Sequence, residues 1–294
     1  MTEANESFFI LSNPRSGSTL LRIILQSHPN ITVPPECGFL QWWHLKYKNW
    51  SQLDAVNRLE VEKFCKDLAS SKKIETYNLD FNLLKENINE QLPENYSDLM
   101  ALVYKTYGVQ QHKDVKVWGD KNNYYIKHID LIKQLYPHTK YIHLVRDGRD
   151  VAVSYFKLKK IKTESPYKPV LHSKIDDIAR EWDYNNQNIL NSLSTIKNEN
   201  KLTVLYEDLV SNLEQECIRL SKFLGVEFNA KMLDYYIINN EKELEPKLTL
   251  DWKMKTLMPP DINLIGQYKM YFSDKEINSF NAIANKSLLS FNYV

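Results

Sequence analysis

The segment 7–28, SFFILSNPRSGSTLLRIILQSH, constrains the fold of this chain more than any other part of the sequence. An apolar run over 8–11 predicts a buried strand, and the polar stretch 12–18 that follows predicts a tight loop. Residues 19–25 have apolar positions at helical spacing and contain neither glycine nor proline, which predicts a helix beginning at the loop. A strand, a loop and a helix in this order are typical of a parallel α/β sheet.

The predicted loop is suited to binding an anion. The first backbone N–H groups of a helix have no partner within the helix, and the helix dipole adds partial positive charge there. Gly17 allows the backbone to approach a phosphate closely, and Ser16, Ser18 and Thr19 supply hydroxyl groups, with Arg15 inside the loop. We therefore predict a phosphate-binding loop; an ordinary strand–helix turn is the alternative for this motif taken alone.

The loop departs from the nucleotide-triphosphate motif G-x-x-x-x-G-K-[ST]. Gly17 and Thr19 match the motif. Ser12 replaces the first glycine, and Ser18 replaces the lysine that reaches the terminal phosphates. Because that lysine is missing, the sequence argues against a magnesium-dependent kinase. A nucleotide-dependent kinase of the P-loop type stays as an alternative function.

The segment 140–154 carries a second candidate phosphate site. Residues 140–145, KYIHLV, predict a strand, and Arg146 follows directly in a loop. We expect Asp150 to cap the next helix and Ser154 to lie one turn inside it. The guanidinium of Arg146 and the hydroxyl of Ser154 could then bind one phosphate. A surface arginine and an unrelated helix-face serine are the alternative for this segment alone.

The two motifs together, PRSGSTLL and VRDGRDVAVS, closely resemble the sulfotransferases that use 3′-phosphoadenosine 5′-phosphosulfate (PAPS). The resemblance extends over most of the chain and includes the shorter stretches WGDK, LYEDL, FLG and IGQY. It implies a three-layer α/β fold in which a P-loop-type parallel sheet is flanked by helices. It also implies that Arg15 and the amides of 16–19 hold the 5′-phosphosulfate, and that Arg146 and Ser154 hold the 3′-phosphate.

The resemblance also implies residues for the chemistry. Sulfuryl transfer requires in-line positioning, stabilisation of developing charge and removal of the acceptor proton. Lys121 lies in the motif where the family has a lysine that stabilises the leaving group. The stretch GDKNN lacks the histidine of the cytosolic small-molecule enzymes. Glu36 instead matches the glutamate base of the branch that includes the tyrosylprotein sulfotransferases. An acid that caps the next helix is the alternative role for Glu36.

Three further residues are candidates for binding the nucleotide. Tyr206 resembles the family's segment near the adenine, although a tyrosine at a strand end also suits a core. Residues 241–262 predict a loop, and in the family a basic loop in this region closes over the cofactor. Many members carry Arg or Lys near the position of Gln267, so the closing cation is open here. Lys255 and Lys269 are the candidates, and solvated surface lysines are the alternative.

The remaining pattern predicts one sulfotransferase domain over 1–294 with a helical insertion at about 37–112. Strands and helices alternate along the chain, as expected for a parallel sheet with helices on both faces. Ser70–Asn95 shows no clear pattern. Beyond the segments already named, we expect strands over 116–118 and 202–205 and helices over 53–69, 98–111, 124–135, 176–193, 207–224 and 273–284.

Composition excludes several classes of protein. Lys and Arg number 38 and Asp and Glu 37, so global charge favours neither nucleic acid nor an anionic membrane as a partner. The three cysteines form no C-x-x-C motif, which argues against a disulfide framework or a zinc site. No acidic cluster suggests a metal, and we expect none. With no signal peptide and no apolar run of about 18 residues, we expect a cytoplasmic protein without a membrane span.

The sequence leaves the acceptor open. Peptide tyrosine, sugar, lipid or polyketide hydroxyls and small phenols all fit a hydroxyl-directed enzyme. A non-catalytic nucleotide-binding protein is a further alternative, and an oligomer is possible.

Overall fold

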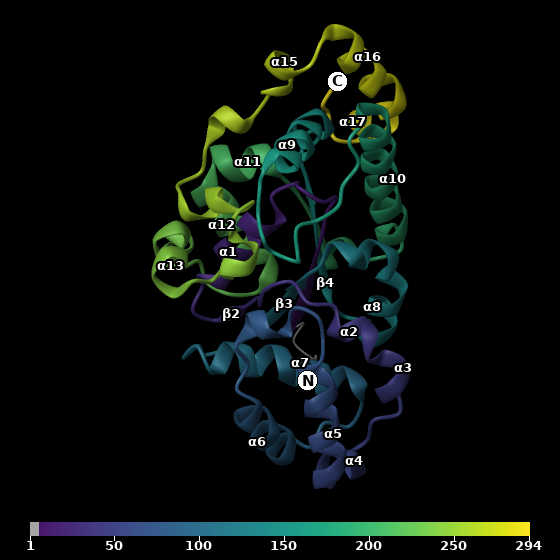
Figure 1. The fold of residues 1–294 in the computed structure, drawn as a ribbon. Coiled ribbons are helices and arrows are strands. Elements are labelled where there is room, and N and C mark those ends of the chain that lie inside the picture. Colours follow the sequence, from purple (N-terminus) through teal and green to yellow (C-terminus); the bar gives the residue numbers. More distant parts are fainter. Residues whose placement is uncertain (1–5) are drawn as a thin grey trace.

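The computed structural model describes residues 6–294, which fold around a five-stranded sheet with the strand order β2-β3-β1-β4-β5 (Figure 1). Every neighbouring pair of strands is parallel. The predicted three-layer α/β fold is confirmed. The strands are β1 (Ser7–Leu11), β2 (Ile31–Thr32), β3 (Val117–Lys121), β4 (Lys140–Val145) and β5 (Lys201–Leu205).

The central strand β1 divides its side chains between two cores, because successive residues of a strand face opposite sides of a sheet. Phe8 and Ile10 belong to one core, and Phe9 and Leu11 belong to the other. Figure 1 shows helices on both faces. The first core includes side chains of α1 (Ser18–Gln26), α12 (Leu213–Leu224) and α13 (Tyr235–Lys242). The second includes α8 (Ile129–Leu135) and the end of α10 (Ile175–Leu193).

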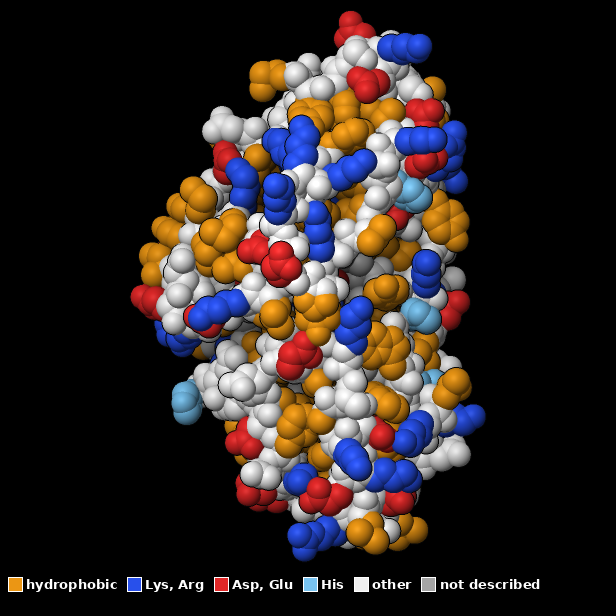
Figure 2. All heavy atoms as spheres, in the orientation of Figure 1, with side chains coloured by type: hydrophobic (Ala, Val, Ile, Leu, Met, Phe, Trp, Pro, Cys, Tyr) orange, Lys and Arg blue, Asp and Glu red, His pale blue; other side chains and the backbone are white. Residues whose placement is uncertain are grey.

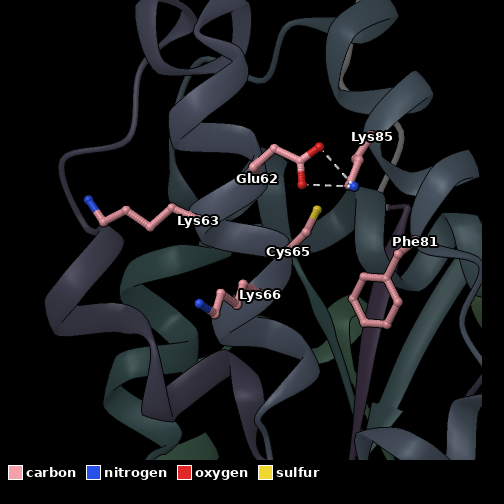
Figure 3. Close-up of a pocket in the computed structure, with 6 residues that line it drawn as sticks. All are labelled: Glu62, Lys63, Cys65, Lys66, Phe81 and Lys85. Atoms are coloured by element: carbon pink, nitrogen blue, oxygen red, sulfur yellow. Dashed lines mark hydrogen bonds and ion pairs between the residues drawn. The ribbon is translucent and has the colours of Figure 1, made fainter.

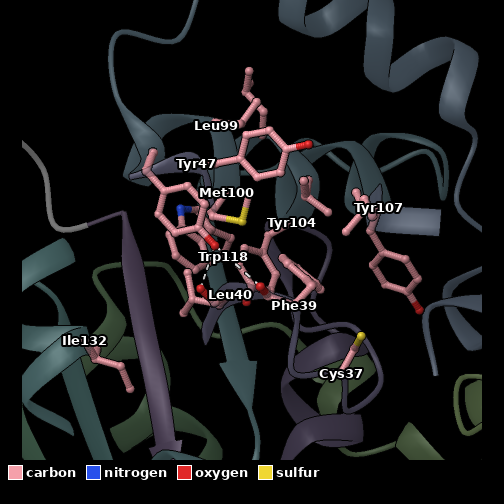
Figure 4. Packing of buried hydrophobic residues seen from close by; sticks show 14 of the residues in the cluster. Cys37, Phe39, Leu40, Tyr47, Leu99, Met100, Tyr104, Tyr107, Trp118 and Ile132 are labelled. Atoms are coloured by element: carbon pink, nitrogen blue, oxygen red, sulfur yellow. Dashed lines mark hydrogen bonds between the residues drawn. The ribbon is translucent and has the colours of Figure 1, made fainter. Parts of the chain in front are cut away.

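The chain between β2 and β3 is helical and extends the second core (Figure 4). Trp118 of β3 stacks on Tyr104 of this region, with ring centroids 4.6 Å apart and an interplanar angle of 4°. Apolar aromatic surface therefore ties the helices to the sheet. The elements are α2 (Phe39–Trp42), α3 (His44–Tyr47), α4 (Gln52–Val56), α5 (Arg58–Ala69), η1 (Ile74–Tyr77), α6 (Phe81–Gln91) and α7 (Tyr96–Val109).

Three predicted helices are interrupted in the structure. The helix expected over 53–69 divides at Asn57, whose side chain caps α5 by accepting the N–H of Leu59. The helix expected over 207–224 divides at Asn212, which leaves helical geometry between α11 (Tyr206–Ser211) and α12. The helix expected over 124–135 begins as the 3₁₀ helix η2 (Asn123–Lys127) and continues as α8.

The C-terminal third contains more short elements than the pattern predicts. The expected final helix is present as α16 (Asp274–Ile283), capped by Ser273 and Glu276, but α17 (Asn285–Ser290) follows it. None of the described helices is both long and apolar enough to cross a membrane. The other elements are α9 (Gly148–Lys160), η3 (Asn198–Asn200), η4 (Ala230–Met232), α14 (Lys247–Leu250), η5 (Met254–Leu257), η6 (Ile262–Leu264) and α15 (Tyr268–Tyr271).

Gly119 allows β3 to run further than the sequence pattern indicates. The stretch 119–121, expected beyond the strand, pairs in register with Phe8, Phe9 and Ile10 of β1. A Cβ atom on Gly119 would lie 2.3 Å from Cζ of Phe8, a side chain that is fully buried. The absence of a side chain at this position therefore makes room for the core of β1.

We expect the substitution Gly119→Ala to lower the free energy of unfolding by about 1–3 kcal/mol, because overpacking forces buried neighbours to shift. Urea unfolding followed by circular dichroism measures the change. Val56→Ala, at a side chain that is 62% exposed, is the control and should change little. Equal stability of the Gly119 variant and the wild type would contradict the packing argument.

Candidate active site

The predicted site residues gather at one edge of the sheet, where the carboxyl ends of the parallel strands meet. The loop 12–17 follows β1, Arg146 follows β4 and Tyr206 follows β5. Lys121 is the last residue of β3, and Glu36 follows β2 after a short extended link. Ligands of open α/β sheets bind at this edge, so the topology alone brings these distant segments together.

The first loop leaves polar groups available to a ligand. Arg15 and Gly17 have φ angles of 68° and 96°, so the backbone turns sharply before α1 begins at Ser18. The loop thereby directs the unpaired N–H groups of the first turn, at Ser18 and Thr19, toward the strand end. Among residues 6–294, the Oγ atom of Ser16 is buried and has no hydrogen-bond partner.

Arg15 connects the two predicted phosphate motifs. Its Nε donates a hydrogen bond to Oγ of Ser154 over 3.2 Å, and its guanidinium also donates to the carbonyl oxygen of Trp252 over 3.0 Å. Burial, together with the nearby charge of Arg146, lowers the pKa of Arg15 to about 10. Arg15 thus keeps its charge at neutral pH, and two neighbouring cations create a site that favours an anion.

Arg146 and Tyr206 form the second half of this anion site. The guanidinium of Arg146 lies 4.3 Å from the centre of the Tyr206 ring and donates to the carbonyl oxygen of Leu264 over 2.8 Å. Within the described chain, Nε of Arg146 is buried without a partner. The ring of Tyr206 also packs on Gly17, where an added Cβ would lie 2.5 Å from it. Tyr206 therefore lies between both phosphate motifs.

The cap of α9 is Asp147 and not Asp150, so that prediction is wrong. Asp147 directly precedes the first helical residue and accepts the N–H of Arg149 over 2.9 Å. Asp150 instead accepts the backbone N–H groups of Gly266 over 2.7 Å and Tyr268 over 3.0 Å. Through these bonds Asp150 ties the C-terminal segment to the helix that carries Ser154.

Glu36 lies among lysines. Its Oε1 accepts from Lys121 Nζ over 3.2 Å and from the N–H of Asn123 over 3.3 Å, and its Oε2 accepts from Lys73 Nζ over 3.2 Å. Burial alone would raise the pKa of Glu36, but the charges of Lys121, Lys73 and Lys253 outweigh it and hold the pKa well below its usual range. Glu36 is therefore ionised at neutral pH, and Lys121 lies beside it.

The structure adds two lysines that sequence reasoning did not select. Lys73 falls in the stretch 70–95, which has no pattern, and no signal in the sequence identifies it. Lys253 lies two residues before the predicted Lys255, and its Nζ is 2.5 Å from Oε1 of Glu245. Burial lowers the pKa of Lys253 to about 8, with Glu245 and Glu36 opposing and Lys121 reinforcing that effect.

Lys255 and Lys269 make no contact with the group formed by Glu36, Lys121, Lys73 and Lys253 among the interactions of the described residues. The side chain of Lys255 is 62% exposed and pairs with Asp261 over 2.9 Å. Nζ of Lys269 lies 6.0 Å from the centre of the Tyr268 ring. Neither lysine has a hydrogen bond or ion pair to another predicted site residue among the bonds of the described chain. A role for them in closing over a cofactor stays a prediction.

Positively charged side chains and a pocket also occur on the surface, away from Glu36, Lys121 and Lys253. Figure 2 shows lysine and arginine side chains gathered over the C-terminal part of α9, whose last turn carries Lys157, Lys159 and Lys160. A surface pocket of about 420 Å³ between α5 and α6 shares no residue with the cluster (Figure 3). Among residues 6–294, no group of three or more His, Cys, Asp or Glu side chains is arranged to hold a metal ion.

A sequence model of the sulfotransferase family matches residues 7–230. The match covers most of the chain, so the protein belongs to the sulfotransferase family. The prediction made from the two phosphate motifs is confirmed at the level of the family, and the alternative of a kinase is not favoured.

Individual relatives agree with this assignment. Protein-tyrosine sulfotransferase A of Caenorhabditis elegans is 22% identical over 235 residues, which are 77% of this chain and 52% of that protein. The chain thus spans about half the length of this curated relative. The sulfotransferase domain of the Synechococcus PCC 7002 olefin synthase has a TM-score of 0.58 at 23% identity and covers 94% of both chains. The sulfotransferase domain of the curacin biosynthetic pathway has a TM-score of 0.59 at 22% identity, covering 94% of this chain and 95% of that one.

Asp120 lies in β3 between Gly119 and Lys121, directly before a residue of the candidate site. It is fully buried, and its carboxylate accepts hydrogen bonds from the hydroxyl groups of Tyr104 and Tyr125. Burial raises the pKa of Asp120 to about 7, although the two tyrosine hydroxyls act in the opposite direction. Its side chain thus binds tyrosine hydroxyls of the core.

The raised pKa of Asp120 predicts a particular dependence of stability on pH. Because the folded state holds this proton more tightly than the unfolded state, whose pKa is about 3.9, stability should fall as pH rises from about 4 to 7 and then level off. In Asp120→Asn this contribution is absent. Urea unfolding between pH 4.5 and 7.5 should therefore show wild type losing stability relative to the variant.

Asp130→Asn is the matched control, because the side chain of Asp130 is 96% exposed. It should follow the wild type at each pH. Parallel pH profiles of wild type and Asp120→Asn would mean that Asp120 does not titrate in this range.

Proposed function

We propose that this protein transfers the sulfuryl group of PAPS to the hydroxyl of an acceptor, giving PAP (3′-phosphoadenosine 5′-phosphate) and a sulfate ester. The observation that carries the proposal is a pair of adjoining arginine sites beside an ionised glutamate and a buried lysine. A kinase loop would instead place its lysine at residue 18, which is serine here.

The residues present fit a doubly phosphorylated nucleotide. Ten buried side-chain polar atoms lack a partner within residues 6–294, and three of them belong to the two loops that follow β1 and β4, namely Oγ of Ser12, Oγ of Ser16 and Nε of Arg146. Buried polar groups are normally hydrogen-bonded, so such atoms at one strand edge favour a ligand there. A solved mouse sulfotransferase with a TM-score of 0.50 at 13% identity contains PAP. We assign the 5′-phosphosulfate to Arg15 and residues 16–19, and the 3′-phosphate to Arg146 and Ser154.

PAPS, when bound, supplies a sulfuryl group attached to a phosphate that is a good leaving group. Arg15 and the amides of the first loop hold this end of the nucleotide in one orientation and offset its negative charge. Lys121 lies at the end of β3 with its ammonium 3.2 Å from Glu36, and we assign it the stabilisation of charge on the leaving oxygen. Tyr206 is held between Arg146 and Gly17, and we assign it a contact with the adenine on the strength of this place between the two phosphate motifs.

Glu36 is the proposed base. Its carboxylate is ionised, because the surrounding lysines lower its pKa. The lysines that keep Glu36 ionised also weaken it as a base, so in this proposal it accepts the proton of the acceptor hydroxyl as the new sulfur–oxygen bond forms and the hydroxyl becomes more acidic. The name of the nematode relative supports a tyrosine hydroxyl as the first acceptor to test. Sugar, lipid, polyketide and small phenolic hydroxyls are the further classes for a screen.

The first test of the proposal is binding of PAP. A ligand that binds only the folded state stabilises it, by about 2.7 kcal/mol at a hundredfold excess over its dissociation constant. Thermal unfolding with PAP, AMP and ATP should show a shift that is largest for PAP. We expect Arg146→Ala to lose most of this shift, because the guanidinium with a free Nε is removed.

Arg180→Ala is the matched control, since the side chain of Arg180 is 62% exposed and its ion pair within residues 6–294 is with Asp177 across one helical turn. It should keep the full PAP shift. Absence of any PAP shift in the wild type, or an equal shift with magnesium and ATP, would reject the sulfotransferase proposal.

The second test is removal of the base. Glu36→Gln keeps the size of the side chain but cannot accept a proton, so transfer from radiolabelled PAPS to a tyrosine peptide should fall by about 10²–10⁴-fold. The PAP shift should stay, because Glu36 does not belong to the phosphate motifs. Glu60→Gln, in an exposed pair with Lys63, controls for the substitution. Full activity of Glu36→Gln would exclude Glu36 as the base.

A further inference from the structure

Lys253 lies near Glu36 and Lys121, on a segment that is hydrogen-bonded to Arg15 of the phosphate loop. The carbonyl oxygen of the preceding residue, Trp252, accepts a hydrogen bond from Arg15 over 3.0 Å. The side chain of Lys253 is only 12% exposed. The backbone contact at Trp252 therefore fixes Lys253 next to the residue that holds the 5′ end of the nucleotide in the proposed function.

A buried chain of charges sets the position of the Lys253 ammonium. Its Nζ is 2.5 Å from Oε1 of Glu245, and Oε2 of Glu245 is 2.8 Å from Arg22. Arg22 belongs to α1, the helix that begins at the phosphate loop, and also donates to the carbonyl oxygens of Val33 and Leu244. The side chains of Arg22 and Glu245 are each 2% exposed. Lys253 is thereby held at a fixed place relative to the start of α1.

The ammonium of Lys253 has more N–H groups than its hydrogen bond to Glu245 uses. An ammonium carries three N–H groups, and the one side-chain hydrogen bond of Lys253 within residues 6–294 is to Glu245. Lys121 and Glu36 are close enough for their charges to act on Lys253. The connected groups carry more positive than negative charge, four cations against two carboxylates: Arg22, Lys73, Lys121 and Lys253 against Glu36 and Glu245. Such an excess in a buried place favours an anionic group between them.

We propose that Lys253 donates a hydrogen bond to the sulfuryl oxygens of bound PAPS. This inference rests on the proposed function and adds a third cation at the transferred group itself. In the transfer, the sulfur–oxygen bond to the leaving phosphate breaks and a sulfur–oxygen bond to the acceptor forms, while the acceptor proton passes to Glu36. Lys253 stays protonated throughout and offsets charge on the sulfuryl oxygens.

The test compares PAPS with PAP, because only PAPS carries the sulfuryl group. Calorimetric titration of the full chain gives both dissociation constants. Lys253→Met should weaken PAPS by about tenfold or more, as expected for one charged hydrogen bond, and should change PAP by less than about threefold. Lys253→Arg should recover part of the PAPS affinity. Lys247→Met is the matched control on the same segment, since the side chain of Lys247 is 76% exposed and pairs with Glu243.

A measurement on the wild type keeps the test independent of folding of the variants. The groups that face Lys253 are Glu245, Glu36 and Lys121, and the pKa of Lys253 is about 8. As pH rises above this value, the ammonium loses its proton and the preference for PAPS over PAP should decline. In Lys253→Arg the preference should stay constant, because arginine remains charged.

The outcomes separate the two proposals. If neither PAP nor PAPS binds the wild type, the proposed function fails. If both bind and Lys253→Met weakens them equally, or leaves PAPS unaffected, Lys253 does not contact the sulfuryl group and the proposed function stands. A selective loss of PAPS in Lys255→Met in place of Lys253→Met would also overturn the inference.

Discussion

The parallel pairing of β1 with β3 and β4 is the constraint on which the site depends. Because all three strands run in the same direction, the loop after Leu11, the side chain of Lys121 and the side chain of Arg146 reach the same edge. The loop after Leu11 is more than a hundred residues from Lys121 and Arg146 in the sequence. Hydrogen bonds of the sheet fix the spacing of the three strands. Burial of alternate β1 side chains on both faces then fixes the register.

Concentrating positive charge at this edge costs free energy, since buried cations repel one another and lose solvation. Backbone carbonyl oxygens offset part of that cost: Arg15 donates to Trp252, Arg146 to Leu264 and Arg22 to Leu244. All three acceptors lie in the C-terminal segment 244–264. This segment therefore stabilises the arrangement of the three arginines and lies against one side of the site. A bound nucleotide with anionic groups at both its 3′ and 5′ positions would offset the remaining repulsion, so folding and binding favour the same geometry.

The order of strands and helices, and the site residues that directly follow a strand, could be predicted from the sequence because their signals are local. The strand, loop and helix over 7–28 are a continuous pattern, and Arg146 follows its strand directly. Boundaries within the insertion could not be predicted, because Asn57 ends one helix and caps the next through a side-chain contact. Lys73 and Lys253 could not be identified for a similar reason. Their neighbours, Glu36 and Glu245, come from other segments, and only tertiary packing selects them over exposed lysines such as Lys255.

The two oxygens of Glu36 are not equivalent, and this difference bears on how an acceptor reaches the base. Oε1 is bonded by the buried Lys121 and by the N–H of Asn123, which belong to β3 and the residues after it. Oε2 is bonded by Lys73, from the insertion between β2 and β3. A carboxylate oxygen accepts two hydrogen bonds, so an acceptor hydroxyl that gives its proton to Oε2 would bind beside the Lys73 ammonium. Lys73 also lies over the ring of Tyr167, whose hydroxyl bonds Glu75. The free side of Oε2 thus adjoins the contact between the insertion and the segment after α9.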